Sequence, residues 1–126
     1  MQFATHRYAE ALVAQPAGRI DHTNAAAFEG ALAPLLGEAG EAHGALVLDF
    51  SAVEYISSVG LRVLMIAAKQ MREQRTALVV AAAQPVVAEI FAISRFDKVL
   101  TLAASVEEAL GHCSAAARAA RAESRP

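Results

Sequence analysis

Tryptophan is absent from this chain of 126 residues, and cysteine occurs only once, at Cys113. A single cysteine cannot form a disulfide bond within the chain, which favours a reducing compartment. Because Cys113 lies close to a run of alanines, we interpret it as a small, half-buried packing residue and not as a reactive thiol. Neither disulfide chemistry nor thiol chemistry is therefore expected.

Long hydrophobic runs are also missing. A membrane-spanning helix needs roughly 18 consecutive apolar residues, and Lys69, Gln84, Pro85 and Glu89 interrupt the longest candidates. The first ten residues alternate between polar and apolar types and contain no hydrophobic signal core. We expect a cytoplasmic protein that makes no direct contact with a membrane.

An excess of positive charge is lacking as well. The chain has 11 Lys and Arg against 13 Asp and Glu, which gives a formal net charge of −2 and no basic field to attract nucleic acid. No cluster with metal-ligand spacing and no glycine-rich phosphate loop occurs, so we predict no metal and no cofactor. With 56% hydrophobic and 19% charged residues, the composition favours one packed domain.

The N-terminal third predicts strands followed by a helix. Residues 3–20 indicate two short strands around a turn, and Pro16 favours an edge position for the second. Residues 25–36 predict a helix that ends at Gly37 and Gly40.

From residue 45 onward, predicted strands alternate with predicted helices. The expected strands are 45–50, 78–81 and 98–102, and the expected helices are 58–73, 85–94 and one that begins with a capping box at Ser105 and Glu108. Nearly continuous apolar runs are typical of strands buried on both faces of a parallel sheet. The alternation predicts an α/β fold with parallel neighbours, preceded by an antiparallel portion. We expect one domain over residues 1–114 and a frayed tail over 115–126.

The most informative segment covers residues 49–64, where the chain leaves a buried strand and enters a helix. In open α/β sheets this edge is where function tends to lie. Either Ser57 or Ser58 is a natural cap for the helix. A phosphate at this helix end would be tolerated by the helix dipole and would add about −1.5 to −2 charges. From the residues alone, a simple cap and a modification site both stay open.

The helix over residues 58–73 has more apolar surface than one sheet can cover. At 3.6 residues per turn, one stripe faces the core and a second, with Ser58 and Arg62, is largely polar. A third stripe, formed by Val59, Val63 and Ile66, is surplus. It would contact either a neighbouring helix of the same domain or a partner protein.

These segments resemble the STAS domain, named for sulfate transporters and anti-sigma factor antagonists. The resemblance rests on the strand at 45–50, on Ser57-Ser58-Val59-Gly60-Leu61 and on Gly18-Arg19-Ile20-Asp21, and the order of elements agrees up to about residue 112. The resemblance is strongest to the stand-alone bacterial antagonists. The resemblance implies a mixed sheet of four to five β-strands with about four α-helices.

The resemblance also implies a function and a site. The phosphoacceptor serine of the family falls on Ser58, and Asp21 falls on an acidic residue that many members carry near that serine. Many antagonists have Asp directly before the acceptor, whereas this chain has Ser57, which leaves Ser57 as an alternative acceptor. The expected partner-binding residues are Asp21, Ser57, Val59, Arg62, Val63 and Ile66.

In the implied cycle, this protein is a switch and not an enzyme. The unphosphorylated form binds an anti-sigma factor that has serine kinase activity and so releases the sigma factor. The kinase then phosphorylates Ser58, which weakens binding, and a serine phosphatase restores the binding form.

Three alternatives have different requirements. A serine hydrolase would need a G-x-S-x-G elbow, but Ile56 occupies the place of the first glycine. A phosphoaspartate receiver ending a strand at Asp49 would need an acidic pair for magnesium, and Asp21 stands alone. Some small STAS proteins are instead cytoplasmic subunits of lipid-transport ABC complexes, and those tend to carry Thr at the position of Ser58.

Overall fold

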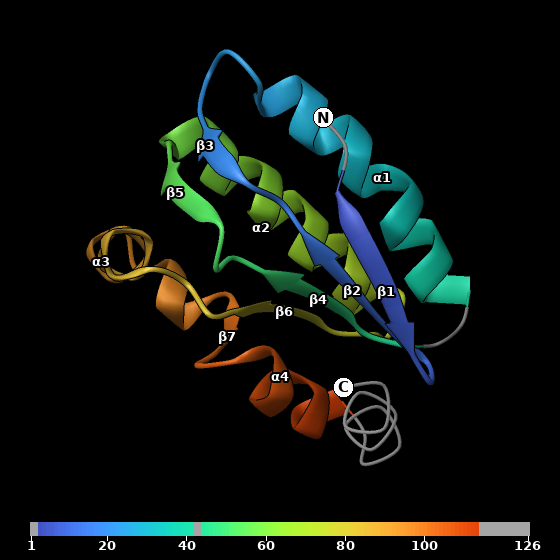
Figure 1. The fold of residues 1–126 in the computed structure, drawn as a ribbon. Helices are drawn as coiled ribbons and strands as arrows, with labels where there is room; N and C mark the ends of the chain where they lie inside the picture. The colour runs from blue at the N-terminus through green and yellow to red at the C-terminus, as the bar shows by residue number, and fades with distance from the viewer. Residues whose placement is uncertain (1–2, 42–43, 114–126) are drawn as a thin grey trace.

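A computed structural model describes residues 3–41 and 44–113, which fold into a mixed sheet with helices on both faces (Figure 1). The strands in this part of the chain are β1 (Ala4–Tyr8), β2 (Ala11–Gln15), β3 (Gly18–Ile20), β4 (Leu46–Asp49), β5 (Val53–Ile56), β6 (Leu78–Ala81) and β7 (Thr101–Ala103). The helices are α1 (Ala25–Glu41), α2 (Ser58–Glu73), α3 (Pro85–Ile93), α4 (Val106–Cys113) and the short 3₁₀ helix η1 (Phe96–Lys98). The α/β class with a mixed five-stranded sheet and four α-helices is confirmed.

The main sheet has the strand order β1-β2-β4-β6-β7. Strand β1 is antiparallel to β2, and every other pair in this sheet is parallel. All four residues of β6 are buried, as are Leu46, Val47 and Leu48 of β4. Burial on both faces explains the continuous apolar runs of these two strands, since each successive side chain points to the opposite layer.

Two hydrophobic layers lie on opposite faces of the sheet. Figure 1 shows α1 and α2 together on one face, where they pack on Leu12, Leu46, Leu48 and Val80. Helix α4 covers the other face, and its apolar side chains join Val13, Val47 and Val79 in a smaller cluster.

Strands β3 and β5 form a separate two-stranded parallel ribbon beyond the carboxyl ends of the main sheet (Figure 1). Ile20 and Ile56 pair at its end, and their exposed fractions are 0% and 1%. The sequence pattern predicts no strand between residues 50 and 58, where β5 lies. Strand β5 was missed because its four residues carry Glu54 and Tyr55 between two apolar ends, too short a pattern to separate from a loop.

The prediction of two N-terminal strands was wrong, because the segment contains three. The chain reverses after β1 at Ala9, whose φ of 54° is left-handed, and not at Pro16. Pro16 lies between β2 and β3, so it removes no hydrogen bond from either strand. Strand β2 is consequently an interior strand, and β1 occupies the edge.

The predicted end of the first helix was also wrong. Helix α1 continues through Pro34, Gly37 and Gly40 to Glu41. Leu36 and Ala39 are buried in the core, and this packing outweighs the poor helix propensity of the glycines. Pro34 is exposed, so the helix carbonyl that loses its partner there can be solvated.

The last predicted strand, 98–102, lies later and is shorter. Residues 96–98 form η1, and the amide of Leu100 donates to the carbonyl of Phe96 at 2.7 Å before β7 begins at Thr101. By contrast, α2 and β6 have the predicted bounds. Within residues 3–41 and 44–113, no helix combines the length and hydrophobicity required to cross a membrane.

The tail expected over residues 115–126 and the side chain of Cys113 lie outside the described part of the structure.

Gly60 allows the first turn of α2 to lie directly against the β3–β5 ribbon. A Cβ atom at this position would lie 2.8 Å from Cγ1 of Ile56 and 2.9 Å from Cγ2 of Ile20. Both distances are shorter than van der Waals contact allows. Because both isoleucines are fully buried, neither can move away without disturbing the core.

We therefore expect Gly60→Ala to lower the free energy of unfolding by about 1–3 kcal/mol through overpacking. Gly30→Ala is the matched control, since Gly30 is also helical and nothing lies within 4 Å of its added Cβ. That control should be neutral or stabilising by up to about 1 kcal/mol. Urea denaturation measures both, and equal stability of the two variants would contradict this account of Gly60.

Candidate functional site

Ser57, and not Ser58, is the N-cap of α2. Its backbone is extended (φ −85°, ψ 172°), and its Oγ accepts a hydrogen bond from the amide of Gly60 at 3.3 Å. Its own amide donates to the carbonyl of Ile20 at 2.8 Å, which anchors the cap to β3. This cap geometry is the one that serine favours at a helix start.

Ser58 is the first residue of α2 and is exposed. Among the described residues, no hydrogen bond to its hydroxyl occurs. The two neighbouring serines thus differ in kind, since the Ser57 hydroxyl holds the helix start and the Ser58 hydroxyl has no hydrogen-bond partner among the described residues.

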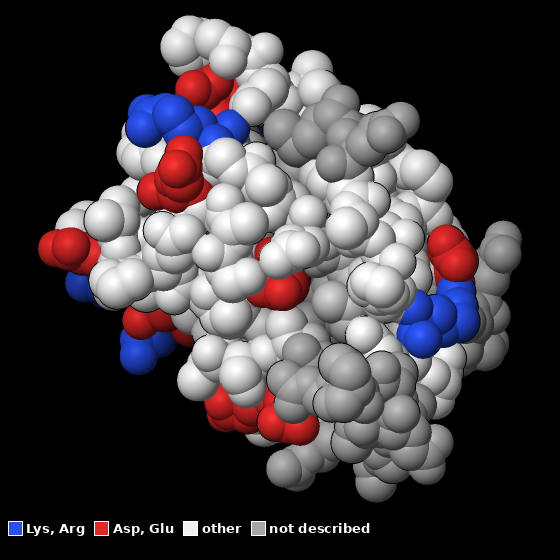
Figure 2. All heavy atoms as spheres, viewed as in Figure 1, with Lys and Arg blue, Asp and Glu red and all other residues white. Residues whose placement is uncertain are grey.

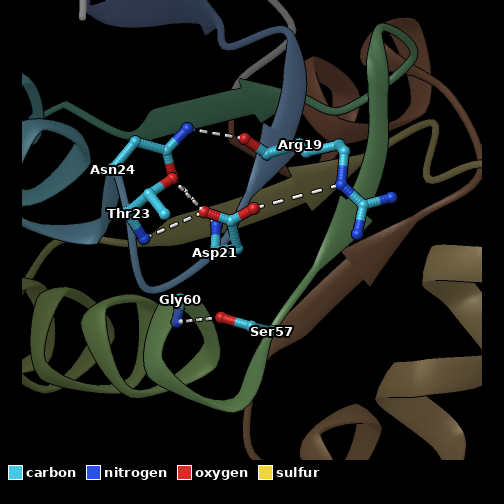
Figure 3. Close-up of polar contacts among 6 residues, drawn as sticks. All are labelled: Arg19, Asp21, Thr23, Asn24, Ser57 and Gly60. Atoms are coloured by element: carbon cyan, nitrogen blue, oxygen red, sulfur yellow. Dashed lines mark hydrogen bonds and ion pairs between the residues drawn. The ribbon is translucent and has the colours of Figure 1, made fainter.

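Asp21 organises the turn between β3 and α1 (Figure 3). Its Oδ1 accepts hydrogen bonds from the amide of Thr23 at 3.0 Å and from the hydroxyl of Thr23 at 2.5 Å. The Asp21 amide donates to Oδ1 of Asn24 at 2.9 Å, and Nδ2 of Asn24 donates to the carbonyl of Arg19 at 2.7 Å. The carboxylate of Asp21 is therefore held in place by its own loop.

The hydrogen bond from the Thr23 hydroxyl, reinforced by that from the Thr23 amide, lowers the pKa of Asp21. The nearby charges of His22 and Arg19 act in the same direction, and partial burial opposes them. The Arg19 guanidinium lies 4.0 Å from Oδ2 of Asp21 and 4.4 Å from the centre of the Tyr55 ring. Asp21 is thus a stable negative charge at neutral pH.

The β3–β5 ribbon brings Asp21 beside the start of α2. Because Ile20 pairs with Ile56 in parallel register, the residues that follow them, Asp21 and Ser57, leave the same end of the ribbon. Figure 3 shows the Asp21 loop and the Ser57–Gly60 cap at this common edge. Asp21 and Ser57 are 36 positions apart in the sequence, and the pairing of β3 with β5 brings them close together.

A groove of about 350 Å³ lies between α1 and α2, and its lining on α2 begins at Val59, the residue after Ser58. From α2 it is lined by Val59, Arg62, Val63 and Ile66, and from α1 by Ala25, Ala26 and Glu29. We call this feature the α1–α2 groove. All four of the α2 residues that were expected to bind a partner line it, and the three α1 residues were not predicted.

The surplus apolar stripe of α2 is neither wholly covered by the domain nor wholly exposed. Val63 is only 8% exposed and lies at the base of the helix pair, whereas Val59 and Ile66 are 44% and 51% exposed. Small residues on α1, Ala25 and Ala26, leave room for the groove. That pair of alanines at the start of α1 was the sequence signal that could have revealed it.

On the face drawn in Figure 2, Lys and Arg side chains lie next to Asp and Glu side chains in small groups, for example at the upper left and at the right. Within the described residues, no group of three or more His, Cys, Asp or Glu side chains is placed to hold a metal ion. His6 stacks on Tyr8 with ring centroids 6.1 Å apart, and His112 lies 3.9 Å from Glu108. His43 lies outside the described residues.

Comparisons with known proteins agree on one family. The model of the STAS domain family matches residues 2–109. The chain is 39% identical over 98 residues to BtrV of Bordetella bronchiseptica, a protein named as a candidate anti-sigma factor antagonist. That alignment covers 78% of this chain and 82% of BtrV.

Solved structures show the same fold. An anti-sigma factor antagonist from Mycobacterium paratuberculosis superposes with a TM-score of 0.74 at 26% identity, covering 88% of this chain and 92% of the other. A candidate anti-sigma factor antagonist from Thermotoga maritima has a TM-score of 0.79 at 17% identity, with 88% and 93% covered.

Because Ser57 caps the helix and Ser58 is exposed, substitutions of the two serines should have different effects on stability. Ser57→Ala removes the cap and should lower the free energy of unfolding by about 1 kcal/mol. Ser58→Ala removes an exposed hydroxyl that has no partner in the described structure and should change it by less than about 0.5 kcal/mol. Thermal and urea unfolding of the two variants measure this, and equal losses would show that Ser57 does not act as the cap.

Asp21 should contribute to acid sensitivity. Because its pKa is lower in the folded chain than in the unfolded one, its ionised form stabilises the fold above the unfolded pKa. That contribution is lost as the pH falls through the folded pKa. We expect Asp21→Asn to have a lower free energy of unfolding than wild type at pH 7, measured by urea titration. The difference between the two proteins should become smaller toward pH 3. A difference that does not depend on pH would contradict a lowered pKa of Asp21.

Proposed function

Because the chain belongs to the STAS domain family, we propose that it is an anti-sigma factor antagonist whose binding is controlled by phosphorylation of Ser58. The unphosphorylated form binds an anti-sigma factor with serine kinase activity in the cytoplasm and frees the sigma factor. The kinase phosphorylates Ser58 and weakens the complex, and a serine phosphatase reverses the modification. The chain itself performs no chemical step in this cycle.

The exposed Ser58 hydroxyl beside the α1–α2 groove is the observation that carries the proposal. A kinase needs an accessible hydroxyl, and the absence of a structural hydrogen bond to it in the described residues means that modification disturbs no packing. A phosphate adds about −1.5 to −2 charges at pH 7. Such a change next to a docking surface alters binding strongly while leaving the fold intact.

The same geometry favours Ser58 over Ser57 as the acceptor. The Ser57 hydroxyl is half-buried and accepts the bond from the Gly60 amide. Phosphorylation there would displace the cap and press a charged group against the β3–β5 ribbon. Ser57 therefore belongs to the site as the residue that positions Ser58.

The proposed docking surface combines apolar and charged groups. Val59 and Ile66 provide exposed apolar area that would be covered by a partner, and Val63 forms the base of the groove. Arg62 lies in the groove lining, and Asp21 lies at the edge near the start of α2. A partner helix or loop with an apolar ridge would fit this surface.

Phosphorylation can be tested directly with the purified chain. Candidate anti-sigma kinases from the same organism are incubated with the protein and ATP, and the modified residue is located by mass spectrometry. We expect one phosphate on Ser58, none on Ser58→Ala protein, and continued phosphorylation of Ser57→Ala protein. A phosphate found on another residue would overturn the assignment.

The switch itself predicts a difference between two variants of Ser58. Ser58→Ala should bind the anti-sigma partner as tightly as unmodified wild type, and Ser58→Asp should bind at least about tenfold more weakly, which is about 1.4 kcal/mol. Calorimetric titration gives both constants. Ser94→Asp, which adds the same charge at an exposed serine outside the groove, is the control and should bind normally. Equal affinity of Ser58→Ala and Ser58→Asp would contradict a switch at this residue.

A further inference from the structure

Arg62 lies one helical turn after Ser58 on the same stripe of α2. Residues four apart on a helix are surface neighbours, with about 5–6 Å between their Cβ atoms. Long side chains on a helix lean toward its N-terminus, so the Arg62 side chain can reach the turn that contains Ser58. Both residues are exposed, which leaves the space between them open to solvent.

The Arg62 guanidinium is uncommitted in the described part of the chain. It forms no ion pair there, although Glu29 lines the same groove. Arg19, the other arginine near the site, is already engaged with Asp21 and with the face of Tyr55. Lys69 is on the stripe of Ser58 but eleven residues further on, about 16 Å along the helix axis, which is too far to reach residue 58.

We propose that Arg62 binds the phosphate once Ser58 is phosphorylated, an inference that rests on the proposed modification of Ser58. A guanidinium can donate two parallel hydrogen bonds to two phosphate oxygens, and such charge-assisted pairs are among the stronger hydrogen bonds in proteins. The i to i+4 spacing places the donor on the correct side of the acceptor without any movement of the backbone. Arg62 is thus the phosphate-binding residue of the modified form.

This pairing changes the α1–α2 groove in two ways at once. The phosphate brings negative charge to one end, and the Arg62 side chain turns toward it and leaves the groove that it lines in the unmodified form. A partner that had contacted Arg62 then meets a groove with one cation fewer. Phosphorylation therefore acts by removing an attractive group as well as by adding a repulsive one.

The pairing can be measured without any kinase or partner. Phosphoserine is placed at position 58 during translation through a reassigned stop codon, and the full chain is titrated from pH 4.5 to pH 8 while its ³¹P resonance is followed. Arg62 stabilises the dianion, so the second pKa of the phosphate in wild type should lie below that in Arg62→Gln. Loss of an i to i+4 ion pair of ordinary strength should raise the proton affinity of the phosphate roughly twofold.

Two control variants make the result specific. Lys69→Gln removes a positive charge from the same helix and should leave the phosphate pKa at the wild-type value. Arg62→Lys keeps the charge without the planar fork and should lie between wild type and Arg62→Gln. In 1 M salt the screening length falls to about 3 Å, so the differences in phosphate pKa between the variants should shrink.

A phosphate pKa that is the same in wild type and Arg62→Gln would overturn the inference. A second readout needs no variant, since the Nε–H resonance of Arg62 in ¹⁵N spectra should move when residue 58 changes from serine to phosphoserine, and an unchanged resonance would also count against pairing. Failure of the proposed function is distinguishable, because it would appear as absent phosphorylation by every candidate kinase or as unchanged partner affinity while the phosphate pKa still responds to Arg62.

Discussion

The contact between the first turn of α2 and the β3–β5 ribbon is the constraint on which the site depends. Gly60 lies so close to Ile20 and Ile56 that no side chain fits between them. The Ser57 amide is bonded to the carbonyl of Ile20 in the same place. These two contacts fix the position and direction of the helix start, and through it the direction in which Ser58 faces solvent.

The residues beneath Ser58 are accordingly fixed by contacts within the domain, and the Ser58 side chain itself is exposed. Asp21 is held by Thr23 and Asn24, and Ser57 is held by Gly60, so these two side chains are already engaged within their own segments. A modification of the Ser58 hydroxyl can change the charge of the surface without a rearrangement below it. In the proposed switch, the information is carried by electrostatics in the α1–α2 groove and not by a change of fold.

Several features followed from the sequence because they depend on local pattern. The helix over residues 58–73 has one continuous core stripe, and the strand over 78–81 is an uninterrupted apolar run, so both were predicted with the observed bounds. Errors arose where tertiary packing opposes local propensity. Helix α1 continues past Gly37 because Leu36 and Ala39 are buried, and β5 forms because β3 pairs with it, neither of which a short window of sequence contains.

The amino-acid sequence by itself determined the α/β class, the amphipathic helix α2 and the presence of a serine pair at its start, since these depend on residue type and spacing alone. Tertiary structure decided which serine is the cap, which one is free, and that Asp21 and the alanines of α1 share the site. Those outcomes depend on the parallel pairing of β3 with β5 and on how closely α2 approaches them. Both are contacts between segments that are far apart in the chain, and they are determined by packing and not by any local preference.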